Sequence, residues 1–179
     1  MTAVLLSPHQ DDAVLFAAFT CYEVRPHVVV VLESHLQEQR GRGITNAMRA
    51  REDECAFGIL GVTHEQWTFR DDAPDWRGIL DCVIRLQEHY DYAYAPAIED
   101  GGHDHHNEIG RIADEVYGAR ATHYMTYRRG HGFSEGSRPI VPAPGALAAK
   151  LHALSCYTSQ IAEESTGHWF FGPFREWHE

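Results

Sequence analysis

The sequence has no apolar run that approaches the roughly 20 residues needed for a membrane-spanning helix. Its amino terminus has no basic region ahead of an apolar stretch, so it does not resemble a secretory signal peptide. These absences predict a cytoplasmic protein with no membrane partner. Lys and Arg are also scarce, with 15 against 26 Asp and Glu and a formal net charge of -11. Because nucleic acids are bound through Lys and Arg, this charge argues against a nucleic-acid partner.

Paired cysteine motifs are missing as well. The four cysteines are widely separated and form no C-x-x-C pair: Cys21, Cys55, Cys82 and Cys156. This spacing predicts buried thiols that act as small hydrophobic side chains. Histidine, in contrast, is abundant, with 13 in 179 residues, and the run "HDHH" at 103–106 is its densest cluster.

The length and the apolar pattern predict one α/β domain over residues 1–179. Short apolar segments predict strands at 4–7, 27–32, 66–69, 90–95 and 123–127. Helical spacing predicts helices at 12–21, 45–60, 76–89, 106–117 and 146–160. This alternation is typical of a Rossmann-like, mostly parallel sheet with helices on both faces. Residues 128–145 are predicted to form a loop. The aromatic tail at 169–177 is predicted to pack back on the body, and it favours a homo-oligomer.

Two polar clusters follow predicted strands in this arrangement. "SPHQDD" comes directly after the first strand, and "EDGGHDHH" comes after the strand at 90–95. Ligands of such folds bind beyond the carboxyl ends of the strands, so both clusters are expected at one rim of the sheet.

The residue types in these clusters suit a catalytic metal, which commonly takes three His, Asp or Glu ligands. His9 and Asp12 are three residues apart and can turn toward one point, and the histidine cluster can supply a third ligand. Asp11 between them would then be available as a general base. Each cluster also has a structural interpretation. The Asp pair can cap a helix, and the histidine run can be a polar loop with a capping Asp.

Four segments resemble the PIG-L/LmbE-like zinc-dependent N-deacetylases. "PHQDDAVL" resembles the PHPDDE-type signature, especially the PHLDDAVL branch, and "GGHDHHNEIG" resembles the HPDH segment with its following glycine. "RAREDECAFGILGV" resembles the Arg-x-x-Glu helix, and "KLHALSCYTSQ" resembles a late Tyr-x-Ser-Gln segment. The four pieces occur in the family's order and cover nearly the whole chain.

The resemblance implies roles for individual residues. His9, Asp12 and His106 would be ligands of zinc, or of another divalent metal such as Fe2+. Asp11 would be the general base toward a metal-bound water. His103, when protonated, would stabilise the oxyanion or donate a proton to the leaving amine. Arg49 would contact substrate hydroxyls. Arg51 is a rival for that role, and a solvated Arg49 paired with Glu52 or Asp53 is the structural alternative.

The chain departs from the family pattern in the histidine cluster. The family's Asp immediately before the last His is replaced by His105, and an Asp stands one position earlier at Asp104. His105 is therefore a competing metal ligand, and the Asp that would orient His103 is displaced by one position. Some relatives carry a Tyr at the position of Gly101.

The resemblance implies a hydrolase that removes an N-acetyl or other N-acyl group from an N-acetylglucosaminyl-type sugar or a related small acylated amine. Two alternatives stay open. One is a metal-dependent amidase with a non-sugar substrate, and the other is a weakly active or inactive metal-binding or ligand-binding member of the fold.

Overall fold

The computed structural model describes residues 1–35, 43–128, 132–162 and 175–179. Within these ranges a seven-stranded sheet has the order β3-β2-β1-β4-β5-β9-β8. Strands β1 to β5 are parallel, and β9 runs antiparallel to both β5 and β8. The strands of this sheet are β1 (Ala3–Ser7), β2 (His27–Glu33), β3 (His64–Arg70), β4 (Tyr92–Pro96), β5 (Ala121–Tyr124), β8 (Arg138–Pro139) and β9 (Trp177–His178). A separate two-stranded ladder pairs β6 (Tyr127–Arg128) with β7 (Gly132–Phe133).

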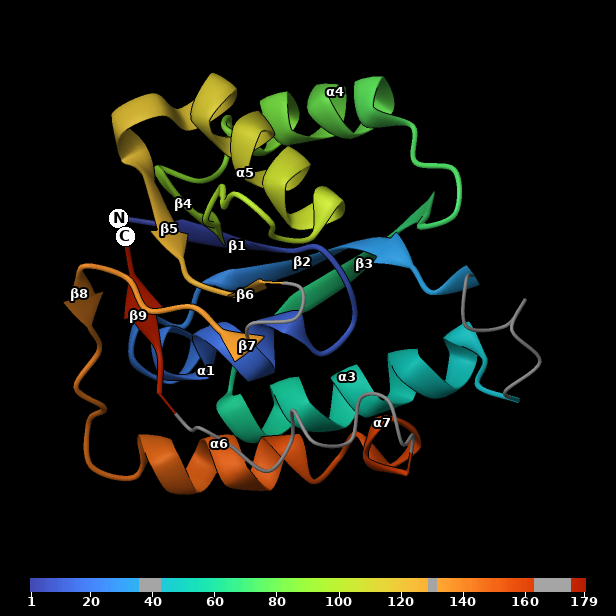
Figure 1. Cartoon of the computed structure of the whole chain (residues 1–179), viewed down its shortest axis with the longest axis vertical. Coiled ribbons are helices and arrows are strands. Elements are labelled where there is room, and N and C mark those ends of the chain that lie inside the picture. The colour runs from blue at the N-terminus through green and yellow to red at the C-terminus, as the bar shows by residue number, and fades with distance from the viewer. Residues whose placement is uncertain (36–42, 129–131, 163–174) are drawn as a thin grey trace.

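Helices cover both faces of the sheet (Figure 1). One layer contains α4 (Trp76–Leu86) and α5 (Asp104–Tyr117), and the other contains α1 (Asp12–Val24), α3 (Asn46–Leu60), α6 (Ala146–Leu154) and α7 (Thr158–Ile161). A short 3-10 helix, η1 (Gly118–Arg120), leads into β5. Alternate residues of β1 enter opposite cores: Val4 and Leu6 lie in the α4–α5 core, and Leu5 lies in the core beneath α1 and α3. The predicted fold class is therefore confirmed.

Gly110 brings α5 close to the end of β4. A Cβ atom at this position would lie 2.5 Å from the Pro96 carbonyl oxygen, so only glycine permits this approach. His106 lies one helical turn earlier, and the same packing places it over the carboxyl end of the sheet.

The helix predicted at 76–89 ends early, at Leu86, and three other predicted elements differ from the structure. The strand expected at 123–127 divides, because β5 ends at Tyr124 and the Met125 N–H then donates to the Trp177 carbonyl oxygen. The helix expected at 146–160 also divides into α6 and α7. Ser155 Oγ donates to the His152 carbonyl oxygen over 2.7 Å, which competes with continued helix formation. The predicted loop at 128–145 contains β7 and β8.

The carboxyl-terminal segment packs on the body, as predicted, where the structure describes it. Trp177 belongs to β9, and buried Glu176 lies 2.7 Å from the Lys150 Nζ atom. The first part of the predicted aromatic tail, at 169–174, lies outside the described residues. Self-association through this tail stays a prediction.

The prediction of four separate thiols is wrong for one pair. Cys55 on α3 and Cys156 at the α6–α7 junction form a disulfide, with Cα atoms 6.0 Å apart and a separation of 101 positions in sequence. Spacing alone could not show this pair, because tertiary packing brings α3 and α6 together. The cytoplasmic localisation stays a prediction.

We expect Cys55→Ser to lower the free energy of unfolding by about 4 kcal/mol, because the disulfide closes a loop of about 100 residues in the unfolded chain. Urea denaturation would measure the change, and the reduced native protein should match the variant. Cys82→Ser is the control, because Cys82 is not disulfide-bonded. An equal loss in Cys82→Ser, or no loss in Cys55→Ser, would contradict a stabilising cross-link.

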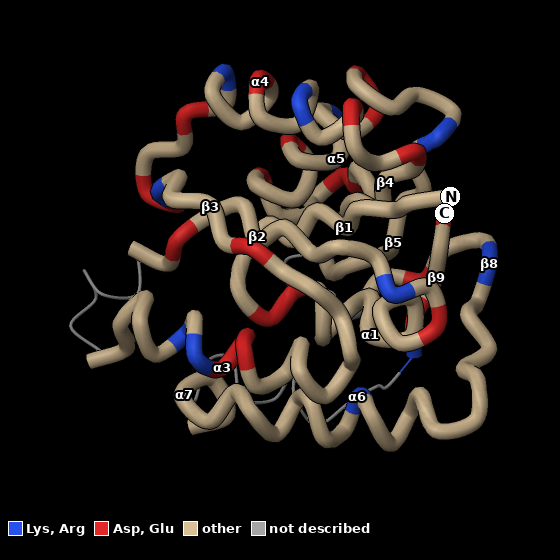
Figure 2. The backbone as a smooth tube through the Cα atoms, turned by 180° about the vertical axis from the view of Figure 1, so that it is seen from behind, with Lys and Arg blue, Asp and Glu red and all other residues tan. Residues whose placement is uncertain are grey.

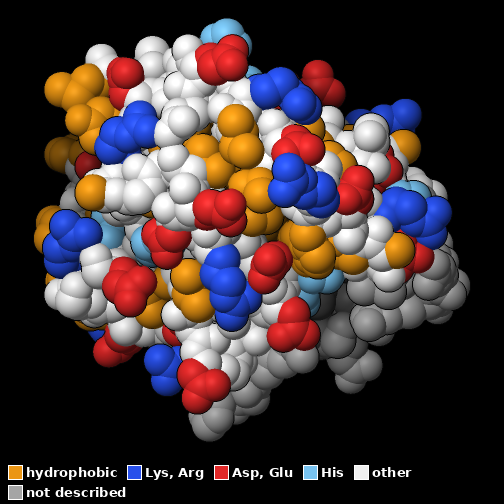
Figure 3. Space-filling model, turned by 90° about the horizontal axis from the view of Figure 1, so that it is seen from above, with side chains coloured by type: hydrophobic (Ala, Val, Ile, Leu, Met, Phe, Trp, Pro, Cys, Tyr) orange, Lys and Arg blue, Asp and Glu red, His pale blue; other side chains and the backbone are white. Residues whose placement is uncertain are grey.

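Acidic and basic positions are distributed through both helical layers (Figure 2). On the face over α4 and α5, charges of the two signs alternate (Figure 3). Arg111 lies 3.0 Å from Glu108 there, and Arg77 lies 3.5 Å from Asp81. None of the helices described is both long enough and apolar enough to span a bilayer.

Candidate metal centre and active site

The turn between β1 and α1 presents the first polar cluster. Ser7 Oγ donates to the His9 carbonyl oxygen and accepts from the Ala13 N–H, which holds the turn closed. Asp11 occupies the N-cap position of α1, but its side chain makes no capping hydrogen bond. Its φ of 89° lies in the left-handed region that favours glycine. The capping interpretation of Asp11 is therefore wrong, and its carboxylate points elsewhere.

Three predicted ligands converge on one point. Asp12 Oδ2 lies 3.1 Å from His9 Nδ1 and 3.1 Å from His106 Nε2. The three ligand atoms all lie within 4.8 Å of one another, although His106 comes from α5, about 95 residues later in the chain. Two imidazole nitrogens and a carboxylate oxygen form a donor set that suits zinc and other divalent transition metals.

His106 has the environment of a metal ligand. Its side chain is 1% exposed, and its Nδ1 lies 3.1 Å from Thr126 Oγ1. Its Nε2 is buried and makes no hydrogen bond to any described residue, even though Asp12 is near. A buried ring nitrogen without a hydrogen bond is costly, and a cation between Nε2 and Asp12 would satisfy it. The residues present therefore fit a divalent cation.

His103 and His105 lie beside this point but face it differently. His103 is the N-cap of α5, and its Nδ1 accepts from the His105 backbone N–H over 3.2 Å. The histidine, and not Asp104, therefore provides the cap. His105 Nδ1 lies 2.8 Å from His9 Nε2, the ring nitrogen opposite the one that faces Asp12. His9, His103 and His105 thus form a second group of nearby nitrogens, which keeps His105 in competition as a ligand.

Arg49 is not a solvated helix charge. Its side chain is 2% exposed, and its Nη2 lies 2.9 Å from Asp11 Oδ2 and also donates to the Gln10 carbonyl oxygen. Arg51, its predicted rival, is exposed on the same helix. The contact of Arg49 with substrate hydroxyls stays a prediction, and the contact that the structure shows is with Asp11.

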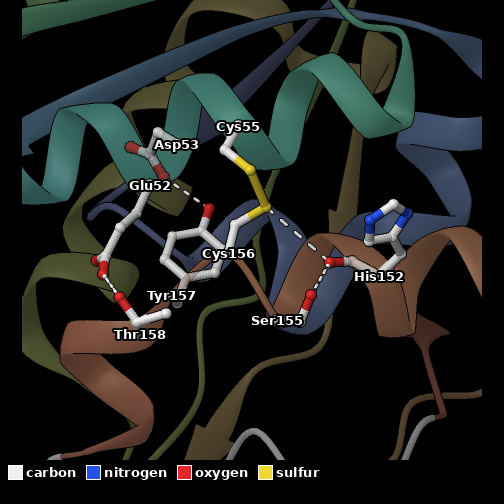
Figure 4. Close-up of a disulfide and its surroundings, with 8 residues drawn as sticks. All are labelled: Glu52, Asp53, Cys55, His152, Ser155, Cys156, Tyr157 and Thr158. Atoms are coloured by element: carbon white, nitrogen blue, oxygen red, sulfur yellow. Dashed lines mark hydrogen bonds between the residues drawn. A yellow bond between two sulfur atoms is a disulfide. The ribbon is translucent and has the colours of Figure 1, made fainter.

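A buried network behind Asp11 was missed at the sequence level, and Figure 4 shows the part of it where Asp53 and Glu52 meet Tyr157 and Thr158. Asp53 Oδ1 accepts from the Asp11 backbone N–H over 3.3 Å and from the Tyr157 hydroxyl over 2.6 Å. Glu52 accepts from the Ser159 N–H and hydroxyl, both over 2.7 Å. The available signals were the Arg-x-x-Glu and Tyr-x-Ser-Gln resemblances, which gave no indication that the two segments meet.

Burial and neighbouring charges shift the pKa values of the two adjacent aspartates in opposite directions. Burial raises the pKa of Asp11 to about 7, and neighbouring Asp12 adds to this rise although Arg49 opposes it. Burial also disfavours an ionised Asp12, but His106 and His9 outweigh burial and hold its pKa well below the ordinary range. Asp12 is thus ionised throughout the neutral range, as a metal ligand must be, while Asp11 can exchange a proton near pH 7.

The surroundings of His103 disfavour the protonated ring that the family resemblance implies. Burial and the neighbouring His9 and His106 rings lower the pKa of His103 to about 2. The free ring is therefore neutral at pH 7. Because its Nδ1 accepts a hydrogen bond from the backbone, its single proton lies on Nε2. The ring can donate from Nε2 while neutral.

Structural comparison shows the same fold in solved proteins of low sequence identity. A deacetylase of the teicoplanin biosynthetic pathway has a TM-score of 0.72 and 18% identity, covering 94% of this chain and 88% of that chain. The deacetylase of the A40926 pseudoaglycone has a TM-score of 0.68 and 18% identity, with coverages of 90% and 83%. The 4-carboxy-2-hydroxymuconate hydratase of Pseudomonas putida has a TM-score of 0.64 and 15% identity, with coverages of 96% and 83%. These likenesses establish the fold.

Sequence comparison identifies the family, whereas the structural likenesses establish only the fold. The chain has no significant match among curated proteins. The sequence model of the PIG-L family, described as GlcNAc-PI de-N-acetylase, matches residues 4–117. This match covers more than half of the chain and includes both polar clusters and the helix that carries Arg49. The chain belongs to the PIG-L family of de-N-acetylases.

Proposed function

We propose that this protein is a zinc-dependent N-deacetylase that hydrolyses the linear amide of an N-acetylglucosaminyl-type sugar or a related small acylated amine. The observation that carries the proposal is the convergence of His9 Nδ1 and His106 Nε2 on Asp12 Oδ2, with Asp11 adjacent. The PIG-L membership supports the reaction class. One structural neighbour is described as the zinc-inhibited form of teicoplanin deacetylase, which supports zinc binding on this fold. We take residues 1–179 as one catalytic domain.

In this proposal His9, Asp12 and His106 hold the cation. A bound zinc ion, or Fe2+ in its place, would lower the pKa of a water molecule and polarise the acyl oxygen. His106 Nδ1 is oriented by Thr126. His9 Nε2 is oriented by His105, whose Nδ1 lies 2.8 Å away, so that His9 Nδ1 is left to face the cation.

Asp11 and His103 then carry the proton chemistry. Asp11 accepts a proton from the attacking water, and Arg49 holds its carboxylate in place. His103 Nε2–H donates to the oxyanion that forms at the carbonyl. Protonated Asp11 returns its proton to the amide nitrogen as the C–N bond breaks, which releases a carboxylate and a free amine. Burial raises the pKa of Asp11 above that of an ordinary carboxylic acid, which favours its acting first as the acceptor and then as the donor of this proton.

The test is acetate release from N-acetylglucosamine and from simple non-sugar N-acetyl amines. The protein is first stripped of metal with a chelator and then assayed with and without added Zn2+ or Fe2+. We expect release only after metal is restored. Preference for the non-sugar amines would favour an amidase of that class. A metal-loaded protein that releases no acetate from any acylated amine would instead be a binding member of the fold.

A further inference from the structure

The backbone of Asp11 requires support that the turn alone does not supply. Its φ of 89° is unusual for a residue with a side chain, and strain of this kind persists only where the surroundings impose it. The carboxylate of Asp11 is held by Arg49 from α3. The backbone of Asp11 is held by a different residue of the same helix.

That residue is Asp53, whose side chain is buried. Its Oδ1 accepts the Asp11 backbone N–H over 3.3 Å, and the same oxygen accepts the Tyr157 hydroxyl over 2.6 Å. Tyr157 is fully buried at the junction of α6 and α7. Burial, with the neighbouring Asp53 carboxylate, raises the pKa of Tyr157 well above its usual value, so its hydroxyl stays protonated and available as a donor.

The helix that carries Asp53 and the α6–α7 junction that carries Tyr157 are joined on both sides of this hydrogen bond (Figure 4). On one flank Glu52 accepts hydrogen bonds from Ser159. On the other flank the Cys55–Cys156 disulfide joins the residue two positions after Asp53 to the residue just before Tyr157. The hydroxyl of Tyr157 therefore has little freedom to leave Asp53.

We propose that Asp53 and Tyr157 are positioning residues for Asp11: Tyr157 orients the Asp53 carboxylate, and Asp53 holds the Asp11 backbone in its left-handed conformation. The effect on turnover rests on the proposed role of Asp11 as general base, but the effect on the Asp11 backbone does not. Because proton transfer depends on accurate placement, a displaced Asp11 lowers kcat without changing the cation ligands.

The first experiment measures hydrogen exchange at the Asp11 backbone amide by NMR and needs no substrate. We expect Asp53→Leu to accelerate this exchange at least about tenfold, because the acceptor is lost. Asp53→Asn keeps an acceptor oxygen and should restore slow exchange. Unchanged exchange in Asp53→Leu would overturn the proposal. If Asp53→Leu does not fold, Tyr157→Phe gives the same test, with accelerated exchange expected and unchanged exchange contradicting it.

The second experiment compares kinetics and zinc affinity in Tyr157→Phe and Tyr117→Phe. Tyr117 is a matched control: it is buried in the opposite layer, and its hydroxyl makes no hydrogen bond to any described residue. Tyr157→Phe should lower kcat about 10- to 100-fold, with KM and zinc affinity unchanged. An equal loss in Tyr117→Phe, or a loss that follows zinc affinity, would overturn positioning. If the native protein has no turnover, the proposed function fails, and the exchange experiment alone decides positioning.

Discussion

Asp11→Asn is expected to lower kcat roughly 10²- to 10⁴-fold while the bound zinc stays near the native level. An amide has nearly the same shape as the carboxylate and can still accept from Arg49, but it cannot take a proton from water. Asp11 is not among the atoms that converge near Asp12 Oδ2, so the ligand set survives the change. Steady-state kinetics together with metal analysis of the same preparation would test both halves.

The measurements of kcat and of bound zinc together distinguish a general base from a metal ligand. Loss of zinc in Asp11→Asn would make this residue a ligand, and unchanged turnover would remove it as the base. Asp81→Asn is a suitable control, because Asp81 lies on the exposed side of α4 in an ion pair with Arg77. This control should keep native kcat and native zinc content.

His106→Ala is expected to weaken zinc binding by at least about 100-fold and to abolish turnover as a consequence. The substitution removes the buried Nε2 that has no hydrogen bond in the described structure. It leaves only His9 and Asp12 of the proposed ligands. Competition with a chromogenic chelator would give the affinity directly and does not depend on the substrate.

Two further variants show whether the loss is specific. Thr126→Val removes the hydroxyl partner of His106 Nδ1 but keeps the ring, and it should weaken zinc binding about 10- to 100-fold. His152→Ala alters an exposed histidine of α6 and should have no effect. Full zinc occupancy in His106→Ala would move the assignment to His105 or His103.

The altered histidine cluster changes the expected chemistry of the site. The family resemblance implies a protonated His103, whereas burial among other imidazoles favours a neutral ring. The residue that replaces the family's Asp, His105, faces His9 and not Asp12. In the proposed mechanism we therefore expect Asp11, and not His103, to supply the proton that the leaving amine needs.

Much of the architecture followed from local pattern. β1 and α1 meet at the "SPHQDD" turn because the apolar strand ends just before Pro8 and helical spacing begins at Asp12. The family resemblance placed His9, Asp12 and His106 in one proposed ligand set, and the structure brings their ligand atoms together. The parallel sheet explains this convergence, since the carboxyl ends of neighbouring strands lie at one rim.

Other features depend on contacts between segments far apart in sequence. Helical spacing at 45–60 shows that Arg49 lies on a helix, but only packing shows that it is buried against Asp11. The Cys55–Cys156 disulfide and the Tyr157 hydrogen bond to Asp53 both arise where α3 meets the α6–α7 junction. The sequence by itself determined which side chains are available for chemistry and which strand ends they follow. Tertiary structure alone decided which of them meet, because the distance and burial that set a charge or a hydrogen bond are properties of the packed chain.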